Sequence, residues 1–393
     1  MSAPHLVIAG AGIGGLAMAL SLARRGIATT IVEKRTGFGE LGAGLQISAN
    51  SGRVLDGLDL ALPLKRVGVA SHGLSVRRWR SGSEIVAMPY EPARMETPFR
   101  LLKRSDLHTL LLDAVRTMPN IRLLVGRGVE EASEDEAGIS VRLSGQNGQA
   151  ETIHGLGLIG ADGLWSCVRD LTGDASPPTF TGYEAWRTTV PARPGDKPRV
   201  TLHLGPGRHA VHYPVAAGRE INIVVVRQAE AAREGWSREG DRAIVTEHLS
   251  GAAPALRELT SAAGDWLVWS LFDRKPAPMA KGRIALLGDA AHPVLPFLAQ
   301  GASLAIEDAA VLARLLADRL GSDGAAGVPA AMADYAKARA ARVARVQAES
   351  RGNGRNYHLG WPLSVARDLA LKHMGPEGLS RRYDWLYDWR DKN

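Results

Sequence analysis

The first residues whose types and spacing suggest chemistry are glycines near the start of the chain. Gly10, Gly12 and Gly15 have the spacing G-x-G-x-x-G, and Glu33 follows 23 residues after Gly10. In this pattern the first glycine makes a tight turn, the second lets the backbone approach a pyrophosphate, and the third lets a helix pack on a strand. The phosphates face the free N–H groups of the helix N-terminus, and the acid binds ribose hydroxyls. We therefore expect a dinucleotide site here.

The elements around this turn have the order that such a site needs. An apolar strand is expected at Leu6–Ala9, an alanine- and leucine-rich helix at Gly14–Arg25, and a second strand at Ile27–Val32. The same spacing recurs at Gly37–Gly42, which leads into no helix, and at Gly155–Gly160, which we expect to lie inside one apolar strand. Only one phosphate site of this kind is therefore predicted.

Two later apolar strands also end in turns that combine glycine with an acid. The first is Gly160-Ala-Asp162-Gly163 and the second is Gly288-Asp289. Since α/β sheets bind ligands at the carboxyl ends of their strands, we expect all three turns to border one ligand. The alternative, that Asp162 and Asp289 only cap turns, stays open.

Two helices belong to the same framework. One is expected over Leu107–Met118, with Ser105 or Asp106 as its N-cap, and a long one over Ala302–Leu316.

Taken together, the three turns resemble those of the single-component flavoprotein aromatic hydroxylases. This family includes the para-hydroxybenzoate, salicylate, 3-hydroxybenzoate and 6-hydroxynicotinate hydroxylases. The resemblance covers nearly the whole chain, in order and at the usual spacing. The stretch from His292 through Ala302, followed by Ala305-Ile-Glu-Asp-Ala, is most similar to the salicylate, 3-hydroxybenzoate and hydroxynicotinate branch.

The resemblance implies a non-covalently bound FAD. Arg104 matches an arginine at the centre of the cofactor, Asp162 an acid used for FAD and nicotinamide nucleotide, and Asp289 the acid that binds the ribityl chain. Gly301 and the helix after it would point at the flavin pyrimidine edge, where a positive helix dipole stabilises the anionic reduced flavin. The FAD-binding residues implied are Gly10, Gly12, Gly14, Gly15, Glu33, Lys34, Arg35, Arg104, Asp162, Gly163, Asp289, Gly301 and Ala302.

The region between the second and third turns has a different pattern. Alternating runs predict a mostly antiparallel sheet with strands at Glu184–Val190, Val200–Leu204, His209–Pro214, Ile221–Arg227 and Trp266–Phe272.

On the strand at residues 209–214, His209 and Tyr213 share a face and His212 points to the other. Related hydroxylases place a histidine and a tyrosine near these positions to bind and deprotonate a phenol, a role that suits a base with a pKa near 7. The alternative, that they are half-buried sheet residues, stays open. We expect Gln46, Pro296 and Gln300 to line the ring pocket.

The implied reaction is that of an NAD(P)H-dependent monooxygenase. NAD(P)H binds transiently and reduces FAD, and O₂ gives a flavin C4a-hydroperoxide that hydroxylates a small phenolic or hydroxypyridine carboxylate. If the hydroxyl enters at the carboxylated carbon, CO₂ is also lost. Two alternatives are a flavoprotein of the same fold with other chemistry, such as an epoxidase or a dehydrogenase, and a flavin-binding protein without turnover.

The composition argues against several other classes of protein. A single cysteine excludes a disulfide framework and a cysteine-rich metal site, and we expect no metal. The net charge of +7 comes from scattered arginines without a basic block, so we expect no nucleic acid partner. The uncharged run Leu6–Ala23 is interrupted by glycines, so we expect neither a membrane span nor a targeting segment. We predict a cytoplasmic enzyme, either a monomer or a homodimer, whose partner is a small aromatic substrate.

The predicted fold class is α/β. A Rossmann-like FAD-binding domain of the glutathione reductase type (residues 1–76, 98–177 and 276–330) carries an inserted, mostly antiparallel substrate domain (77–97 and 178–275). A helical segment (331–393) follows, and its late aromatic residues are expected to cover the FAD domain or to contribute to a dimer. These residues are Trp361, Tyr383, Trp385, Tyr387 and Trp389.

Overall fold

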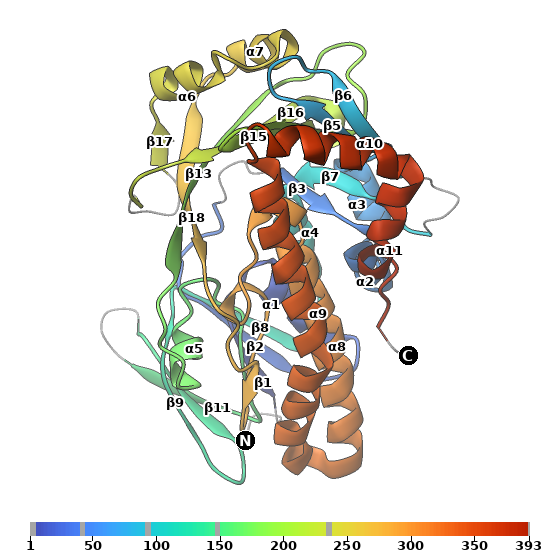
Figure 1. Ribbon diagram of the computed structural model, residues 1–393. Coiled ribbons are helices and arrows are strands. Elements are labelled where there is room, and N and C mark those ends of the chain that lie inside the picture. The colour runs from blue at the N-terminus through green and yellow to red at the C-terminus, as the bar shows by residue number, and fades with distance from the viewer. Residues whose placement is uncertain (1–4, 40–43, 91–95, 146–149, 233–237, 392–393) are drawn as a thin grey trace.

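A computed structural model describes residues 5–39, 44–90, 96–145, 150–232 and 238–391 (Figure 1). A parallel sheet with long helices forms one half of the molecule, and a larger sheet topped by two short helices forms the other (Figure 1). This arrangement confirms the α/β fold with an inserted, mostly antiparallel sheet. Among the described residues, no helix is long and apolar enough to cross a membrane.

The first half is built on a six-stranded sheet with the order β19-β20-β12-β1-β2-β8. All neighbouring strands are parallel except the pair β19–β20. Since β12, β1 and β20 are parallel neighbours or next neighbours, the three glycine turns lie together at one edge, as predicted. The strands are β1 (Leu6–Ala9), β2 (Thr29–Glu33), β8 (Ile121–Val125), β12 (Leu158–Gly160), β19 (Ala280–Lys281) and β20 (Ile284–Leu286).

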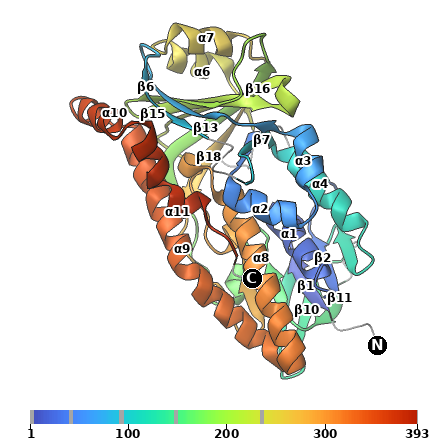
Figure 2. The ribbon, with the colours of Figure 1, turned by 90° about the vertical axis from the view of Figure 1, so that its right-hand side faces the viewer.

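Helices and a small meander enclose this sheet. The helices α1 and α8 pack against each other, and α9 packs on α8 (Figures 1 and 2). The meander adds its buried residues, such as Val141 and Leu143, to the same apolar core. The helices are α1 (Ile13–Ala23), α4 (Arg104–Arg116), α5 (Cys167–Leu171), α8 (Gly301–Asp323) and α9 (Val328–Tyr357), and the meander is β9 (Val129–Glu134), β10 (Ile139–Leu143) and β11 (Glu151–Gly155).

Two local predictions were wrong. The helix α4 begins at Arg104, one turn earlier than expected, and neither Ser105 nor Asp106 is its N-cap. The Gly155–Gly160 segment is not one strand, because β11 ends at Gly155 and β12 begins at Leu158 in a different sheet. A carbon added at Gly157 would lie 2.7 Å from the side chain of Met332 of α9, so this glycine allows the helix to pack closely on the link between the two strands. Of the Gly37–Gly42 match, residues 40–42 lie outside the described residues.

The second half is an eight-stranded sheet with the order β17-β18-β13-β16-β15-β14-β5-β6, antiparallel except at β14–β5. The helices α6 (Arg242–Leu249) and α7 (Pro254–Ser261) cover one face, and the opposite face turns toward the FAD-binding half (Figure 1). All five predicted strands are present. The strands are β5 (Gly73–Arg78), β6 (Glu84–Pro89), β13 (Thr179–Pro191), β14 (Val200–Gly205), β15 (Arg208–Val215), β16 (Glu220–Gln228), β17 (Arg238–Gly240) and β18 (Trp266–Asp273).

A third, small sheet joins the two halves. Its order is β3-β7-β4, and β7 lies against β15 of the larger sheet. The elements of this junction are β3 (Gly44–Ile47), α2 (Ala49–Gly57), α3 (Ala61–Val67), β4 (Val69–Ala70), β7 (Arg100–Lys103) and the single turns η3 (Ala216–Gly218), η4 (Gly288–Ala290), η5 (Pro296–Leu298) and η6 (Gly324–Gly327).

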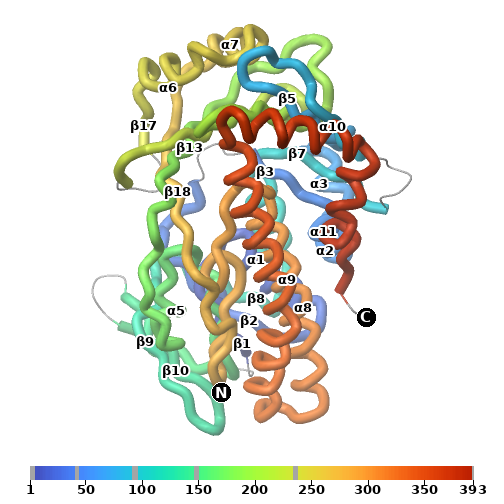
Figure 3. Tube along the Cα trace, viewed as in Figure 1, coloured from blue at the N-terminus to red at the C-terminus, as the bar shows by residue number. Residues whose placement is uncertain are grey.

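The C-terminal residues run back along the molecule. After α9 come α10 (Leu363–Arg382), beside β6, and α11 (Asp384–Tyr387), beside α2 (Figure 3). Tyr383 and Leu386 are buried in an apolar cluster with Phe99 and Leu204, whereas Trp361 is 83% exposed. Most of the late aromatic run therefore docks on the molecule itself, as one of the two expectations stated.

Candidate active site

The first glycine turn is shaped by backbone crowding. Gly10 has a φ of +102°, and a carbon added there would lie 2.5 Å from the carbonyl oxygen of Ala161. A carbon added at Gly15 would lie 2.0 Å from the carbonyl oxygen of Gly10. At Gly12, by contrast, such a carbon meets nothing within 4 Å. The turn is therefore closed at its first and third glycines and open at the second, where a pyrophosphate needs room.

Glu33 holds this turn at the end of β2. Its Oε2 accepts a hydrogen bond from the Ala11 N–H at 2.8 Å, and its Oε1 accepts one from the Arg35 N–H at 2.9 Å. Lys34 and Arg35 are exposed beside it. A hollow of about 580 Å³ follows, between the loop after β2, α4 and β8. Its lining includes Thr36, Phe38, His108, Asp113, Leu123 and Val125.

Asp162 and Asp289 occupy equivalent strand ends but are used differently. The Asp162 carboxylate accepts hydrogen bonds from the N–H groups of Cys167 at 2.9 Å and Val168 at 3.2 Å, and from the Ser166 hydroxyl. It thus caps the start of α5, as the alternative interpretation stated. The open side of this turn is Gly163, with a φ of +81° and no atom within 4 Å of an added carbon. This turn can therefore offer a ligand its backbone.

Asp289 makes no hydrogen bond to any of the described residues. Burial raises the pKa of Asp289, and the charges of Arg104 and His292 oppose that shift. Its Oδ1 lies 3.9 Å from the position of a carbon added at Gly301, the first residue of α8. A carboxylate that lies beside a helix N-terminus and has no hydrogen-bond partner in the described residues is suited to accept hydrogen bonds from the hydroxyl groups of a ligand.

On the sheet face opposite α6 and α7, Tyr213 lies in a polar cluster. Burial raises the pKa of Tyr213, and its side chain is hydrogen-bonded to Gln46 of β3. Asn222 stands opposite Tyr213 on β16 and accepts a hydrogen bond from the Gly44 N–H at 2.8 Å. The Asn222 Nδ2 is buried and has no hydrogen-bond partner among the described residues, so it is a donor available to a ligand. The sequence pattern around Asn222 resembles an ordinary strand and did not indicate it.

His209 lies two residues before Val211 and four before Tyr213 on the same face, and it is 4% exposed. Its Nδ1 is 2.8 Å from Nε2 of His358, and the two rings stack with centroids 5.1 Å apart. Burial and then His358 lower the pKa of His209 well below 6.5, and so below the value near 7 that suits a base. His358 ends α9 and was not predicted, because 149 residues separate it from His209.

The remaining predicted residues lie where η5 leads into α8. Pro296 is exposed and begins η5, and Ala299 after it adopts a left-handed conformation (φ 52°). Gln300 is 2% exposed, and its amide bonds to Ser48 at 3.0 Å and Asn50 at 3.1 Å. The Gln300 amide therefore holds the loop after β3, and its predicted place in the lining of the ring pocket stays a prediction. His212 points to the opposite sheet face and stacks on His203, as expected.

Comparison with known proteins identifies the family. The model of the FAD binding domain family matches residues 4–350. A 3-hydroxybenzoate 6-hydroxylase of Polaromonas naphthalenivorans (strain CJ2) is 32% identical over 99% of this chain and 96% of its own. A 3-amino-4-hydroxybenzoate 2-monooxygenase of Streptomyces platensis is 34% identical over 98% and 96%. The chain belongs to the FAD-binding aromatic hydroxylase family.

The fold of this hydroxylase agrees with a solved structure. A salicylate hydroxylase in complex with its substrate superposes with a TM-score of 0.83 at 24% identity, covering 99% of this chain and 96% of the other. The family model and the two relatives show the activity and the cofactor: the hydroxylase is a flavoprotein monooxygenase that uses FAD.

The geometry of the hydroxylase fits FAD. The open position at Gly12, the hollow beyond Glu33 and the unbonded carboxylate of Asp289 follow one another along the edge where the three strands end. They would hold the pyrophosphate, the adenosine and the ribityl chain, and Gly301 would face the flavin. FAD supplies the activation of O₂, and the protein supplies binding, orientation and the placement of protons.

Proposed function

We propose that this monooxygenase hydroxylates the ring of a phenolic carboxylate, a hydroxybenzoate, held on the sheet face of β15. The observation that carries the proposal is the row His209, Val211 and Tyr213, with a polar cluster at one end and a histidine pair at the other. Four residues of strand span about 13 Å, so His209 and Tyr213 are far enough apart along the strand to contact opposite ends of one aromatic ring.

The two ends of this row suit different parts of the substrate. At one end the Asn222 Nδ2 and the Tyr213 hydroxyl offer polar contacts that fix orientation. At the other end burial keeps His209 neutral at pH 7, so its imidazole can accept a hydrogen bond from the phenol, and the negative charge of a phenolate beside it would favour the protonated ring that proton transfer creates. A ring that has lost its phenolic proton is richer in electrons, so it reacts faster with an electrophilic oxygen.

A buried cation favours an anionic substrate. Arg187 of β13 stands opposite Val224, and Val224 stands opposite Val211, so all three side chains point to the same face. Arg187 is 7% exposed, and its guanidinium lies 4.5 Å from the centre of the Trp269 ring. Both relatives named above carry a carboxylate in the names of their substrates, a 3-hydroxybenzoate and a 3-amino-4-hydroxybenzoate, and this supports a carboxylate on the substrate of this enzyme.

The test is direct. The purified protein should carry the absorbance of bound flavin, and NADH or NADPH oxidation should rise when a hydroxybenzoate is added from a panel that includes hydroxypyridine carboxylates. Mass spectrometry should find one added oxygen with the carboxyl group retained. Bound flavin without stimulation by any aromatic compound would refute the proposal. A product that has lost CO₂ would show that the hydroxyl group enters at the carboxylated carbon. Stimulation by hydroxypyridine carboxylates alone would show that these, and not hydroxybenzoates, are the substrates.

The oligomeric state, the absence of a nucleic acid partner and the cellular location are part of the same proposal. We propose a cytoplasmic enzyme that binds no nucleic acid and works as a monomer or homodimer. Light scattering on the purified protein distinguishes the two, and fractionation of the source cells tests the location.

A further inference from the structure

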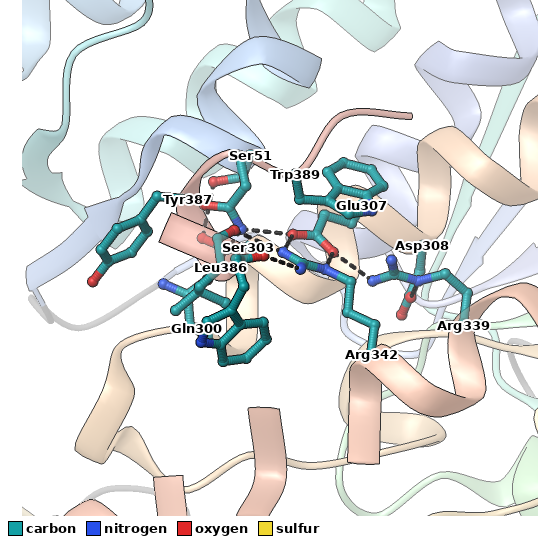
Figure 4. A network of polar contacts seen from close by, with 12 residues as sticks. Ser51, Gln300, Ser303, Glu307, Asp308, Arg339, Arg342, Leu386, Tyr387 and Trp389 are labelled. Atoms are coloured by element: carbon teal, nitrogen blue, oxygen red, sulfur yellow. Dashed lines mark hydrogen bonds and ion pairs between the residues drawn. The ribbon is translucent and has the colours of Figure 1, made fainter. Parts of the chain in front are cut away.

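Behind the flavin-facing end of α8 lies a cluster of buried charges. Glu307 and Asp308 are 0% exposed and Arg339 is 1% exposed. Arg339 donates from Nε to Asp308 at 2.7 Å and from Nη2 to Glu307 at 2.7 Å. Arg342 donates to both oxygens of Glu307 at 2.6 Å. Figure 4 shows the Glu307 carboxylate facing the guanidinium groups of Arg342 and Arg339. Two acids are thus balanced by two arginines.

One side of this cluster leads to the third glycine turn. Asp308 accepts hydrogen bonds from the Gly288 N–H at 3.0 Å and shares one with Nε2 of His292 at 2.6 Å. Burial raises the pKa of Asp308, but the charges of His292 and Arg339 outweigh it and the pKa falls to about 2. Asp308 is therefore ionised and holds the residue before Asp289.

The other side leads to the first residues of α8. Glu307 accepts a hydrogen bond from Nδ2 of Asn50 at 2.6 Å, and the same Nδ2 donates to Oε1 of Gln300 at 3.1 Å. Gln300 precedes Gly301, the first residue of the helix. Ser303 adds a hydroxyl contact to Ser51 at 2.8 Å. The charge on Glu307 thus decides how the amide before Gly301 is held.

The C-terminal segment, residues 384–391, closes the cluster from outside. Arg342 donates to the carbonyl oxygens of Trp385 at 3.1 Å and Leu386 at 2.9 Å. The Trp389 ring lies 5.3 Å from the Arg342 guanidinium and 5.4 Å from that of Arg339. Figure 4 shows Trp389 beside Glu307. These contacts keep water from the ion pairs, and charges buried away from water act over longer distances.

We propose that Glu307 and Arg342 are positioning residues for the flavin. Together they hold the start of α8, and their charges set the net charge of the buried cluster behind the flavin. The proposal rests on the proposed placement of the flavin at Gly301. Six residues of helix put Glu307 about 9 Å from Gly301 along the axis. Removal of the Arg342 charge makes the cluster more negative, which destabilises the anionic reduced flavin. Neutralisation of Glu307 makes the cluster more positive, which stabilises the anionic reduced flavin.

The test is the reduction potential of the bound FAD, measured against reference dyes without any aromatic substrate. Arg342→Gln should make the potential more negative and Glu307→Gln should make it more positive. The double variant should return toward the wild-type value, because both charges are gone. Each single variant should also weaken FAD binding by about tenfold, since one partner of a buried pair remains without its counterion.

Two further variants separate charge from packing. Arg345→Gln is the matched control, because the Arg345 guanidinium lies 3.7 Å from the centre of the Trp385 ring and, among the described residues, makes no hydrogen bond or ion pair with Glu307, so the potential should not move. Arg342→Lys keeps the charge but cannot bond both Glu307 oxygens and the two carbonyls, so FAD should bind more weakly at an unchanged potential. It also serves if Arg342→Gln does not fold.

The proposal would be overturned if the reduction potential shifted with the same sign in Arg342→Gln and Glu307→Gln, or by no more than in Arg345→Gln. The cluster would then only stabilise the fold. Hydroxylation by the wild-type enzyme is a separate readout. If it is present while the potentials do not respond, this inference fails and the proposed function stands. If the wild-type protein binds FAD and hydroxylates nothing while the potentials shift as expected, the proposed function fails and this inference stands.

Discussion

The edge proposed to bind FAD and the sheet face proposed to bind the substrate differ in the kind of group that they present. At the edge, three strand ends present backbone, and the positions that matter are glycines where an added carbon would meet a carbonyl oxygen or open space. On the face of β15, the groups that matter are side chains, and each has a partner from another part of the chain: Tyr213 from β3, and His209 from the end of α9.

This difference predicts two kinds of failure. A change at the edge should act through crowding, and so it should alter folding or cofactor binding. A change on the face should leave FAD bound and alter the reaction. Each prediction below tests whether that separation holds.

The largest effect is expected at Gly15. In Gly15→Ala the new carbon would lie 2.0 Å from the Gly10 carbonyl oxygen, so the turn must open. The free energy of unfolding should fall by at least about 3 kcal/mol, and FAD should no longer bind. Thermal unfolding of the apoprotein and flavin absorbance measure the two.

Gly12→Ala is the matched control. Its carbon meets no protein atom within 4 Å, so the apoprotein should unfold at the wild-type temperature. FAD affinity should nevertheless fall by about 100-fold, because the methyl group takes the space of the pyrophosphate. An apoprotein destabilised as much as Gly15→Ala would contradict the view that the second glycine is kept for the ligand.

The FAD edge could be predicted from the sequence because its rules are local. A glycine turn between a strand and a helix, and an acid at the end of the next strand, lie within 24 residues, from Gly10 to Glu33. The sequence left the use of Asp162 open between a ligand contact and a turn cap. Whether a carboxylate caps its own helix or faces a ligand depends on the path of the backbone over the next few residues, which the Asp-Gly pair does not specify.

The second prediction concerns the substrate face. His209→Gln should lower kcat for hydroxylation by about 100-fold and leave FAD affinity within about twofold of wild type, because the side chain supplies a proton acceptor and no cofactor contact. Single-turnover measurements with the reduced enzyme and O₂ separate this step from flavin reduction. His212→Gln lies on the opposite face of the same strand and should leave kcat unchanged. Loss of FAD from His209→Gln would show that the two regions are not separable.

On this face the strands were predictable and the partners were not. Alternation along β15 places His209 and Tyr213 on one side, and the structure agrees. His358, Asn222 and the arginines around Glu307 come from elements whose own patterns indicate only a helix or a strand. Their roles arise from packing between segments far apart in the sequence, as with the 149 residues between His209 and His358.

The pH dependence of stability tests the two faces of the sheet against each other. His203 and His212 stack on the face away from the site, with ring centroids 5.6 Å apart. Burial and then Arg77 lower the pKa of His203 to about 4, and burial, then His203 and Arg77, lower that of His212 to about 3. The ordinary value in the unfolded chain is 6.5. The folded protein therefore binds fewer protons, and stability is full above pH 6.5 and is lost as the pH falls from there toward 4.

At pH 5 each of these two histidines should cost about 2 kcal/mol relative to pH 7.5, measured by chemical unfolding of the apoprotein. The variant His203→Gln/His212→Gln removes both groups, so its stability should change less between the two pH values, whatever its stability at pH 7.5. His209 and His358 titrate similarly in both proteins, since they lie on the other face, and their contribution cancels in the difference. If the variant and the wild type lose equal stability on acidification, the histidines of the outer face are not held neutral by the fold. The acid sensitivity would then come from other groups with lowered pKa values, among them His248 of α6 and the His209–His358 pair.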